Sequence, residues 1–241
     1  MGETHKSAPT FDAFVDDYEA ACDRGVRLSG ESRDYFAARR IHLTASWCAA
    51  GIPVDRLIDF GCGLGHSTPG LSSAFPNALI TGVDSSPRSI DAARRRYEND
   101  RTDFTSDPAS VGAQSAQLVY SNGTFHHIEP QDRLSNVRTI WHYLKPGGLF
   151  ALWENNPWNP GTRLVMSRIP FDRDAKPLSF LETHRLLKRG GFDIVATSFH
   201  FYFPAALKAL RSFEPLLRRL PLGAQYCVLA RRSEAGSSLR D

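Results

Sequence analysis

The chain has 241 residues, of which 41% are hydrophobic and 23% charged. A chain of this length buries roughly 70–75% of the surface that it exposes when unfolded, and its composition excludes a disordered, collagen-like or coiled-coil protein. The net charge of +3 is too small to require a nucleic-acid partner.

The order of predicted elements indicates an α/β fold. Residues 1–50 are expected to form an N-terminal helical cap, and from residue 51 onward short apolar runs alternate with helical stretches, as in strand-helix-strand units with a parallel sheet. The predicted strands are 56–60, 78–83, 103–105, 116–121, 148–154, 192–203 and 225–230. The predicted helices are 67–74, 87–99, 131–144, 178–189 and 204–219, with Pro215 expected to break the last one near its end.

We expect one domain over residues 1–241. Residues 51–154 form its cofactor-binding core, and 178–232 complete the sheet. The segment 155–177 holds four prolines and no clear period, so it is expected to be a lid over the carboxyl ends of the strands. Residues 233–241, which are mostly small and polar, are expected to be a flexible tail.

A glycine-rich turn follows the first predicted strand. Asp59-Phe60-Gly61-Cys62-Gly63-Leu64-Gly65 places three glycines at alternate positions, where glycine permits positive φ and lets a ligand approach the backbone. A dinucleotide fingerprint would need a further glycine at position 66, where this chain has His66. The turn therefore predicts a nucleotide-like cofactor and disfavours a nicotinamide dehydrogenase.

A second acid ends the next strand. Asp84 follows the apolar run 79–83 and lies 23 residues after Gly61, where a carboxylate can accept hydrogen bonds from both hydroxyls of a ribose. The alternative is that Asp84 only caps the turn into the helix that begins at Pro87.

These motifs together resemble those of class I S-adenosylmethionine-dependent methyltransferases. The matching segments are 59–65, 82–86, 118–128 and 144–148. The resemblance implies a Rossmann-like, seven-stranded, mostly parallel sheet with helices on both faces and an antiparallel last strand. It implies S-adenosylmethionine as cofactor and S-adenosylhomocysteine as product. The cofactor-binding residues that it implies are Asp59, Gly61, Cys62, Gly63, Asp84, Ser85, Asp107 and Asn122. For Asp107, which would bond the adenine amine, a plain turn role before Pro108 competes.

Catalytic candidates follow the fourth strand. His126 and His127 stand where a general base would face the transferred methyl group, and a role in cofactor packing or structural hydrogen bonding is the alternative. Adjacent residues of an extended chain point in opposite directions, so we expect one of the two to face the pocket. For the same reason the pair is poor metal-ligand geometry, and no metal site is predicted.

Candidate acceptor-binding residues follow the fifth strand. Glu154, Asn155, Asn156 and Trp158 are either an acceptor-binding rim or the ordinary chemistry of a turn. In front of the first strand, the candidates to close the site from above are Tyr18 and residues 29–31 and 35–36, with amphipathic helix packing as the alternative. Phe199, Phe201 and Phe203 alternate along a predicted strand and should share one face, as core residues rather than a substrate wall.

The predicted function is methyl transfer to a small molecule, with an oxygen acceptor favoured. An RNA or protein methyltransferase and a catalytically silent S-adenosylmethionine-binding subunit are the alternatives. A nucleic-acid target is disfavoured because Asn122-Gly123-Thr124-Phe125 replaces the Asn-Pro-Pro-Tyr type of motif used on base amines. No apolar run approaches the roughly 20 residues of a membrane span. The four cysteines form no C-x-x-C pair, so we expect a cytoplasmic protein. The sequence leaves the oligomeric state open.

Overall fold

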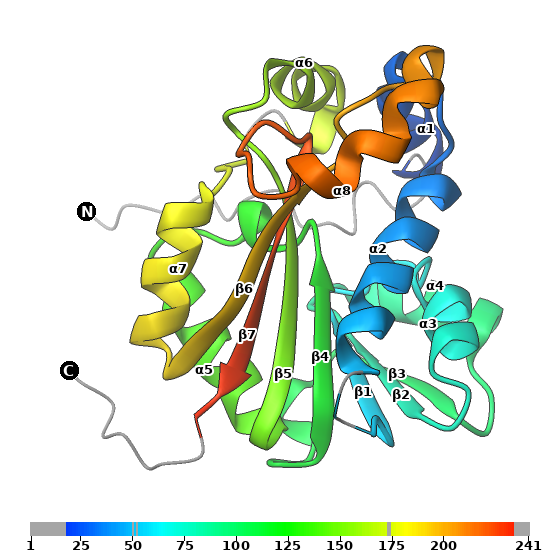
Figure 1. Ribbon diagram of the computed structural model, residues 1–241. Helices are drawn as coiled ribbons and strands as arrows, with labels where there is room; N and C mark the ends of the chain where they lie inside the picture. The colour runs from blue at the N-terminus through cyan, green and yellow to red at the C-terminus, as the bar shows by residue number, and fades with distance from the viewer. Residues whose placement is uncertain (1–17, 50, 52, 173–174, 234–241) are drawn as a thin grey trace, which may run out of the picture.

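The strands form one seven-stranded sheet in the order β3-β2-β1-β4-β5-β7-β6 (Figure 1). The computed structural model describes residues 18–49, 51, 53–172 and 175–233. The strands are β1 Arg56–Phe60, β2 Leu79–Val83, β3 Thr102–Thr105, β4 Ala116–Asn122, β5 Leu144–Asn155, β6 Phe192–His200 and β7 Gln225–Arg232. Strands β1 to β5 pair in parallel, and β7 runs antiparallel to both β5 and β6. The predicted fold class, with its antiparallel last strand, is confirmed.

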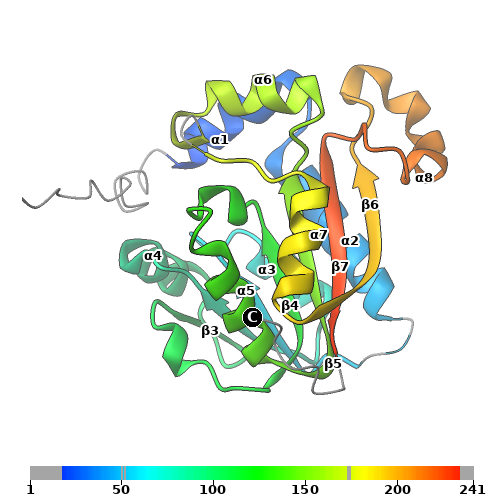
Figure 2. The same cartoon turned by 90° about the vertical axis from the view of Figure 1, so that its left-hand side faces the viewer.

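Helices cover both faces of this sheet. Helices α2 (Arg33–Cys48), α3 (Thr68–Ala74) and α4 (Pro87–Tyr97) pack on one face, and α5 (Arg133–Tyr143) and α7 (Phe180–Arg189) pack on the other (Figures 1 and 2). Three of these helices begin where the sequence supplies a cap. The Ser32 side chain accepts from the backbone N–H of Tyr35 at the start of α2. The Ser86 side chain accepts from the backbone N–H of Ser89 ahead of Pro87, and Ser179 forms a capping box with Glu182.

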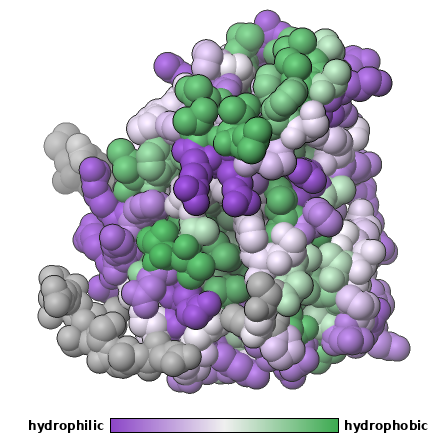
Figure 3. Space-filling model, in the orientation of Figure 1, coloured by the Kyte–Doolittle hydropathy of each residue, from purple (hydrophilic) through white to green (hydrophobic). Residues whose placement is uncertain are grey.

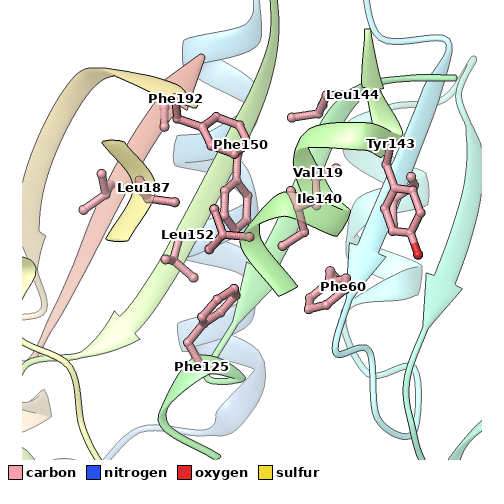
Figure 4. Close-up of a cluster of buried hydrophobic side chains, with 14 of the residues drawn as sticks. Phe60, Val119, Phe125, Ile140, Tyr143, Leu144, Phe150, Leu152, Leu187 and Phe192 are labelled. Atoms are coloured by element: carbon pink, nitrogen blue, oxygen red, sulfur yellow. The ribbon is translucent and has the colours of Figure 1, made fainter. Parts of the chain in front are cut away.

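The core lies in two layers because the side chains of each strand alternate between the faces. One cluster joins α5 and α7 to the sheet through side chains such as Phe125, Ile140, Phe150 and Leu187 (Figure 4). The second joins α2 and α3 to the sheet and contains Trp153, whose ring stacks on Trp47 at 5.8 Å. Both layers hold the central strands rigidly, so the loops at their carboxyl ends have a fixed base.

Three further segments lie over the carboxyl ends of the parallel strands (Figures 1 and 2). They are α1 (Tyr18–Val26) with the 3₁₀ turn η2 (Arg27–Ser29), α6 (Pro160–Arg168) with the 3₁₀ turn η5 (Pro170–Asp172), and η6 (Ala205–Phe213) with α8 (Glu214–Leu217). Apolar side chains gather on the outside of this cap, at the top of Figure 3. Exposed apolar residues of η6, α8 and the loop that follows α8 are Leu207, Leu210, Phe213, Leu216, Leu220 and Leu222.

Two expectations about this cap need correction. The segment 155–177, predicted without periodic structure, contains α6, which begins after Asn159 because the Asn159 side chain accepts from the Thr162 N–H. The helix predicted over 204–219 is a 3₁₀ helix up to Phe213, with a non-helical residue at Leu207, and only four residues of α-helix follow. Pro215 lies in the first turn of α8 and starts that helix instead of breaking one near its end.

The three phenylalanines near the end of β6 do not share a face. Phe199 packs in the cluster with α5 and α7, whereas Phe201 packs in the cluster with α2 and α3. The strand ends at His200, and Phe201 adopts a φ of +63°, which interrupts the alternation on which the prediction depended.

Parts of four expected segments lie outside the described residues, namely residues 1–17 and 50 of the N-terminal cap, residue 52 of the core, residues 173–174 of the lid and residues 234–241 of the tail. Within the part of the chain that the structure describes, no helix is long and apolar enough to cross a membrane.

Candidate functional site

A cavity of about 570 Å³ lies between the sheet and the cap. It begins where the glycine-rich turn ends, at His66 and Ser67, and passes the ends of β4 and β5 at Asn122 and Asn155. The cap supplies the opposite wall through side chains such as Ser29, Glu31, Tyr35, Phe36, Val165 and Tyr202. Residues from the two ends of the chain and from its middle therefore meet at one place.

The glycine-rich turn has the conformation that its residues predict. Gly61, Gly63 and Gly65 all have positive φ, between 51° and 77°. A Cβ atom on Gly61 would lie 2.2 Å from Cγ2 of Thr124, while one on Gly63 would meet nothing within 4 Å. Gly61 is thus required by packing, whereas Gly63 leaves open space beside the backbone that a ligand can occupy.

Asp84 organises this turn. One carboxylate oxygen accepts from the N–H of Gly63 at 2.8 Å, and the other accepts from the N–H of Ser86 at 2.9 Å. The side chain is partly exposed, so it can also meet a ligand at the end of β2. Both readings of Asp84 are therefore compatible with its geometry, because it caps the following turn while facing the space beside Gly63.

Asp59 and Cys62 lie beneath the turn. Asp59 is 2% exposed, and burial together with the neighbouring Asp84 raises the pKa of its carboxyl to about 7. The Cys62 side chain packs with Ile90 and Phe104 under α4, and burial raises the pKa of its thiol. Neither side chain lines the cavity, so contact between Cys62 and a cofactor would be through its backbone.

The remaining cofactor candidates occupy different environments. Asn122 lines the cavity, whereas Ser85 is exposed at the end of β2. Asp107 is exposed, and its side chain accepts from the N–H of Ala109 at 2.9 Å to cap the 3₁₀ turn η3 (Pro108–Ser110). The turn role weighed for Asp107 is present, and the adenine role stays a prediction.

The two histidines lie at the floor of the cavity. Nδ1 of His126 is 2.6 Å from Oε2 of Glu154, and the other oxygen of Glu154 accepts from the N–H of Phe125 at 2.7 Å. Burial lowers the pKa of His126, but Glu154 and Asp172 outweigh it and raise the pKa to about 10. His126 is therefore held as an imidazolium between two carboxylates.

His127 also contacts Asp172, which belongs to the η5 turn of the cap. Its Nε2 lies 3.3 Å from Oδ1 of Asp172, which is 3.6 Å from Nε2 of His126. Burial lowers the pKa of His127 below its usual value, although Asp172 acts in the opposite direction. Burial also opposes ionisation of Asp172, but the two histidines lower its pKa to about 2.

The expectation that the two imidazoles point in opposite directions is wrong. Both lie in the 3₁₀ turn η4 (Phe125–His127), and their ring centroids are 4.1 Å apart. The alternation rule fails because it holds for extended backbone only. Their ligand atoms and that of Asp172 lie within 4.8 Å of one another, a spacing able to hold a metal ion. No sequence signal marked Asp172, since it belongs to the segment predicted as structureless.

The four acceptor-binding candidates have separate roles. Glu154 is 1% exposed and holds His126, and Asn156, also 1% exposed, donates to the carbonyls of Pro221 and Gly223. Trp158 is 48% exposed and packs edge-on against Phe180 outside the cavity lining. Asn155 alone among the four lines the cavity, where its Oδ1 accepts from Gln225 at 3.1 Å.

Comparison with known proteins places the central part of the chain in context. Residues 57–148 match the family model of a methyltransferase domain. The matched segment runs from β1 into β5 and includes the glycine-rich turn, Asp84 and both histidines. The segments that form the cap lie outside it.

Two curated relatives differ in the reactions that their names describe. The chain is 31% identical over 147 residues to trans-aconitate 2-methyltransferase of Variovorax paradoxus, covering 58% of this chain and 56% of the relative. It is 32% identical over 146 residues to carboxy-S-adenosyl-L-methionine synthase of Erwinia tasmaniensis, covering 58% and 54%. The chain therefore spans about half the length of the curated relatives that it matches.

A solved structure extends the likeness to nearly the whole fold. The cyclase SpnF superimposes with a TM-score of 0.65 at 16% identity, covering 95% of this chain and 98% of that one. At this identity the likeness concerns the fold alone, and a cyclase on the same fold shows that architecture does not decide the reaction.

Proposed function

We propose that this protein transfers a methyl group from S-adenosylmethionine to a small-molecule acceptor, because residues 57–148 match the model of a methyltransferase domain and carry the motifs that resemble the class I, S-adenosylmethionine-dependent type. The observation that carries this proposal is the position of the cavity. Its lining includes the end of the glycine-rich turn and also His126, His127 and Asp172, which together with the buried Glu154 form a cluster of two histidines and two carboxylates. A donor bound at the turn would therefore face an acceptor beside that cluster.

The residues at the turn fit the cofactor. The open space beside Gly63 admits a ligand, and the Asp84 carboxylate beside it is suited to the ribose hydroxyls. Asn122, at the end of β4, lies in the wall between this turn and the histidines. When bound, S-adenosylmethionine supplies an activated methyl group, so the protein's main task is to align donor and acceptor, which can contribute roughly 7–11 kcal/mol.

The histidines have unequal roles in this proposal. His126 is fixed by Glu154 and serves as a charged positioning residue, whereas His127 is oriented by Asp172 and can accept a proton. The cofactor would supply the methyl group, which would pass from its sulfonium sulfur to the acceptor oxygen, and the proton of an acceptor hydroxyl would pass to the ring nitrogen of His127 that does not face Asp172. A carboxylate acceptor carries no proton and would need no base.

A small molecule is the acceptor class that the cavity favours. Its volume of about 570 Å³ lies within the range of roughly 300–1,000 Å³ usual for small-ligand sites. The name of the Variovorax relative describes a small organic acid as acceptor, which supports this class. An oxygen acceptor stays favoured, and RNA or protein acceptors and a catalytically silent cofactor-binding subunit stay as alternatives.

Calorimetric titration with S-adenosylmethionine, S-adenosylhomocysteine, NAD and NADP tests the cofactor. We expect micromolar binding of the first two alone. An acceptor screen that follows a labelled methyl group then tests transfer. Binding without transfer to any acceptor would favour the silent subunit, and binding of the nicotinamide cofactors alone would overturn the proposal.

A further inference from the structure

Arg40 is a buried cation in the wall of the cavity. It belongs to α2, is 8% exposed, and donates from Nη1 to Oε1 of Gln225 at 2.9 Å. Gln225 in turn donates to Asn155 at 3.1 Å, so the guanidinium is fixed to the ends of β7 and β5. Its Nε is buried and has no hydrogen-bond partner among the described residues.

Arg40 also has no carboxylate partner in the part of the chain that the structure describes. Two other arginines of the cavity wall are paired, since Arg33 contacts Asp23 at 2.6 Å and Arg211 contacts Glu31 at 2.8 Å. The Arg40 guanidinium interacts with the phenol of Tyr120. Burial raises the pKa of Tyr120 to about 12, so this side chain is neutral and does not balance the charge of Arg40.

Burial of a charged group without a counter-charge is costly, and proteins compensate it with several hydrogen bonds or an ion. The charge of Arg232 is compensated by hydrogen bonds. It is 5% exposed, donates to the carbonyls of Trp141 and Leu144, and lies over the Trp141 ring at 3.6 Å. Arg40 donates to Gln225, acts on the Tyr120 phenol and borders an open cavity, so the Nη donors that these contacts leave unused are the ones that a ligand can reach, whereas Nε is buried.

We propose that Arg40 binds a carboxylate inside the cavity, and that this carboxylate belongs to the methyl acceptor. The acceptor would then be an organic acid, held by charge-assisted hydrogen bonds from the planar guanidinium. The assignment of the carboxylate to an acceptor rests on the proposed methyl transfer, whereas the anion site itself rests on the burial and contacts of Arg40.

Two molecules in the proposed reaction carry a carboxylate, the acceptor and the amino-acid end of the cofactor. The position of Arg40 favours the acceptor. Its partner Gln225 begins β7, which is separated from β1 by β4 and β5. Neighbouring strands lie about 4.8 Å apart, so Gln225 lies roughly 14 Å across the sheet from the strand that carries the glycine-rich turn. The guanidinium itself spans the distance between Gln225 and Tyr120 of β4, the strand next to β1.

The test measures thermal unfolding of the full chain with paired ligands, namely succinate and benzoate against succinamide and benzamide. The native protein should be stabilised by at least one acid and not by its amide. Arg40→Met should weaken that binding at least tenfold, and Arg40→Lys should retain part of it. Arg39→Met is the matched control, since Arg39 is the exposed next residue of α2 outside this cavity. Equal effects of acid and amide, no response to any acid, or unchanged binding by Arg40→Met would overturn the proposal.

A second arm identifies the source of the carboxylate. Titration of Arg40→Met with S-adenosylhomocysteine and with 5′-methylthioadenosine, which lacks the amino-acid part, should give native affinities for both. Weakened binding of S-adenosylhomocysteine alone would assign the carboxylate to the cofactor and overturn the acceptor assignment. If the native protein binds the acids but not S-adenosylhomocysteine, the anion site stands and the proposed methyl transfer fails.

Discussion

Nδ1 of His126 lies 2.6 Å from Oε2 of Glu154, and the two side chains are 4% and 1% exposed. A carboxylate this deeply buried is stable only because the imidazolium and the N–H of Phe125 compensate its charge. The pair ties the turn after β4 to the end of β5 and fixes the floor of the cavity.

Glu154→Gln should therefore lower the free energy of unfolding by about 3 kcal/mol at pH 7, because it leaves a buried imidazolium without its partner. The folded-state pKa of His126, about 10, lies above the usual value of 6.5 for an imidazole. Its stabilisation is thus complete below pH 6.5 and is lost as the pH rises toward 10. Denaturant unfolding from pH 6 to 10 should show this decline in the native protein and a flatter profile in Glu154→Gln.

Glu129→Gln is the control, because it affects an exposed pair with Lys176 and should cost less than about 1 kcal/mol. Equal losses of stability in the two variants would contradict the prediction.

Asp84→Asn should weaken S-adenosylhomocysteine binding roughly 10- to 100-fold, the range expected when a charge-assisted pair of hydrogen bonds is lost. Calorimetric titration measures the change, and a thermal melt checks that the variant folds. Asp91→Asn, an exposed acid on the following helix α4, should bind normally. Native affinity in Asp84→Asn would remove the ribose assignment and leave Asp84 as a cap of the turn.

Gly61→Ala and Gly63→Ala form a second matched pair, since both residues have positive φ. At Gly61 the new Cβ would lie 2.2 Å from Thr124, so we expect a loss of stability well above the 1–2 kcal/mol that left-handed backbone costs alone. At Gly63 the Cβ meets nothing, so stability should fall by only about 1–2 kcal/mol while cofactor affinity falls more. Urea unfolding and calorimetry separate the two effects. Cofactor affinity unchanged in Gly63→Ala would show that the open space beside this residue is not the binding site.

Asp59 also predicts that stability depends on pH, but here burial and a neighbouring like charge are the cause. Burial and Asp84 raise its folded-state pKa to about 7, from 3.8, so the folded protein binds the extra proton between these values. Stability should therefore fall as the pH rises from 4 to 7, with roughly 2–4 kcal/mol from this group. In thermal melts, Asp59→Asn should lose most of this fall in stability between pH 4 and 7, and it should be at least as stable as the native protein at pH 8. As a control, Asp103→Asn, which changes an exposed acid on β3, should keep the fall. The same fall in Asp59→Asn would show that Asp59 is not the group that titrates.

His127→Ala tests the proposed base once an acceptor has been found. For a hydroxyl acceptor we expect kcat to fall roughly 10²- to 10⁴-fold with little change in cofactor affinity. Asp172→Asn should reduce kcat less, because it acts through the orientation of His127. His184→Ala, on α7 and bonded to Thr197, is the control for loss of a histidine. A native kcat in His127→Ala would exclude it as the base and point to an acceptor atom that carries no proton.

Local signals in the sequence predicted the cofactor side of this protein. Strand–glycine–helix order around Gly61 and Gly63, and an acid at the end of the next strand, depend on backbone conformation and short-range spacing. Such features depend on consecutive residues, so the α/β fold class and most element positions could be predicted from them, whereas the antiparallel last strand was implied by the resemblance to a known family.

The sequence by itself thus determined the sheet and the turn beside Asp84. Only the tertiary structure decided which polar side chains meet in the cavity. Asp172 reaches the histidines because α6 and η5 cover the strand ends, and Glu154 turned out to hold His126 instead of lining an acceptor rim. Arg40 and Gln225, 185 residues apart in the chain, meet through packing of α2 against the sheet. The physical reason is that burial and charge pairing are set by contacts between distant segments, which no local pattern records.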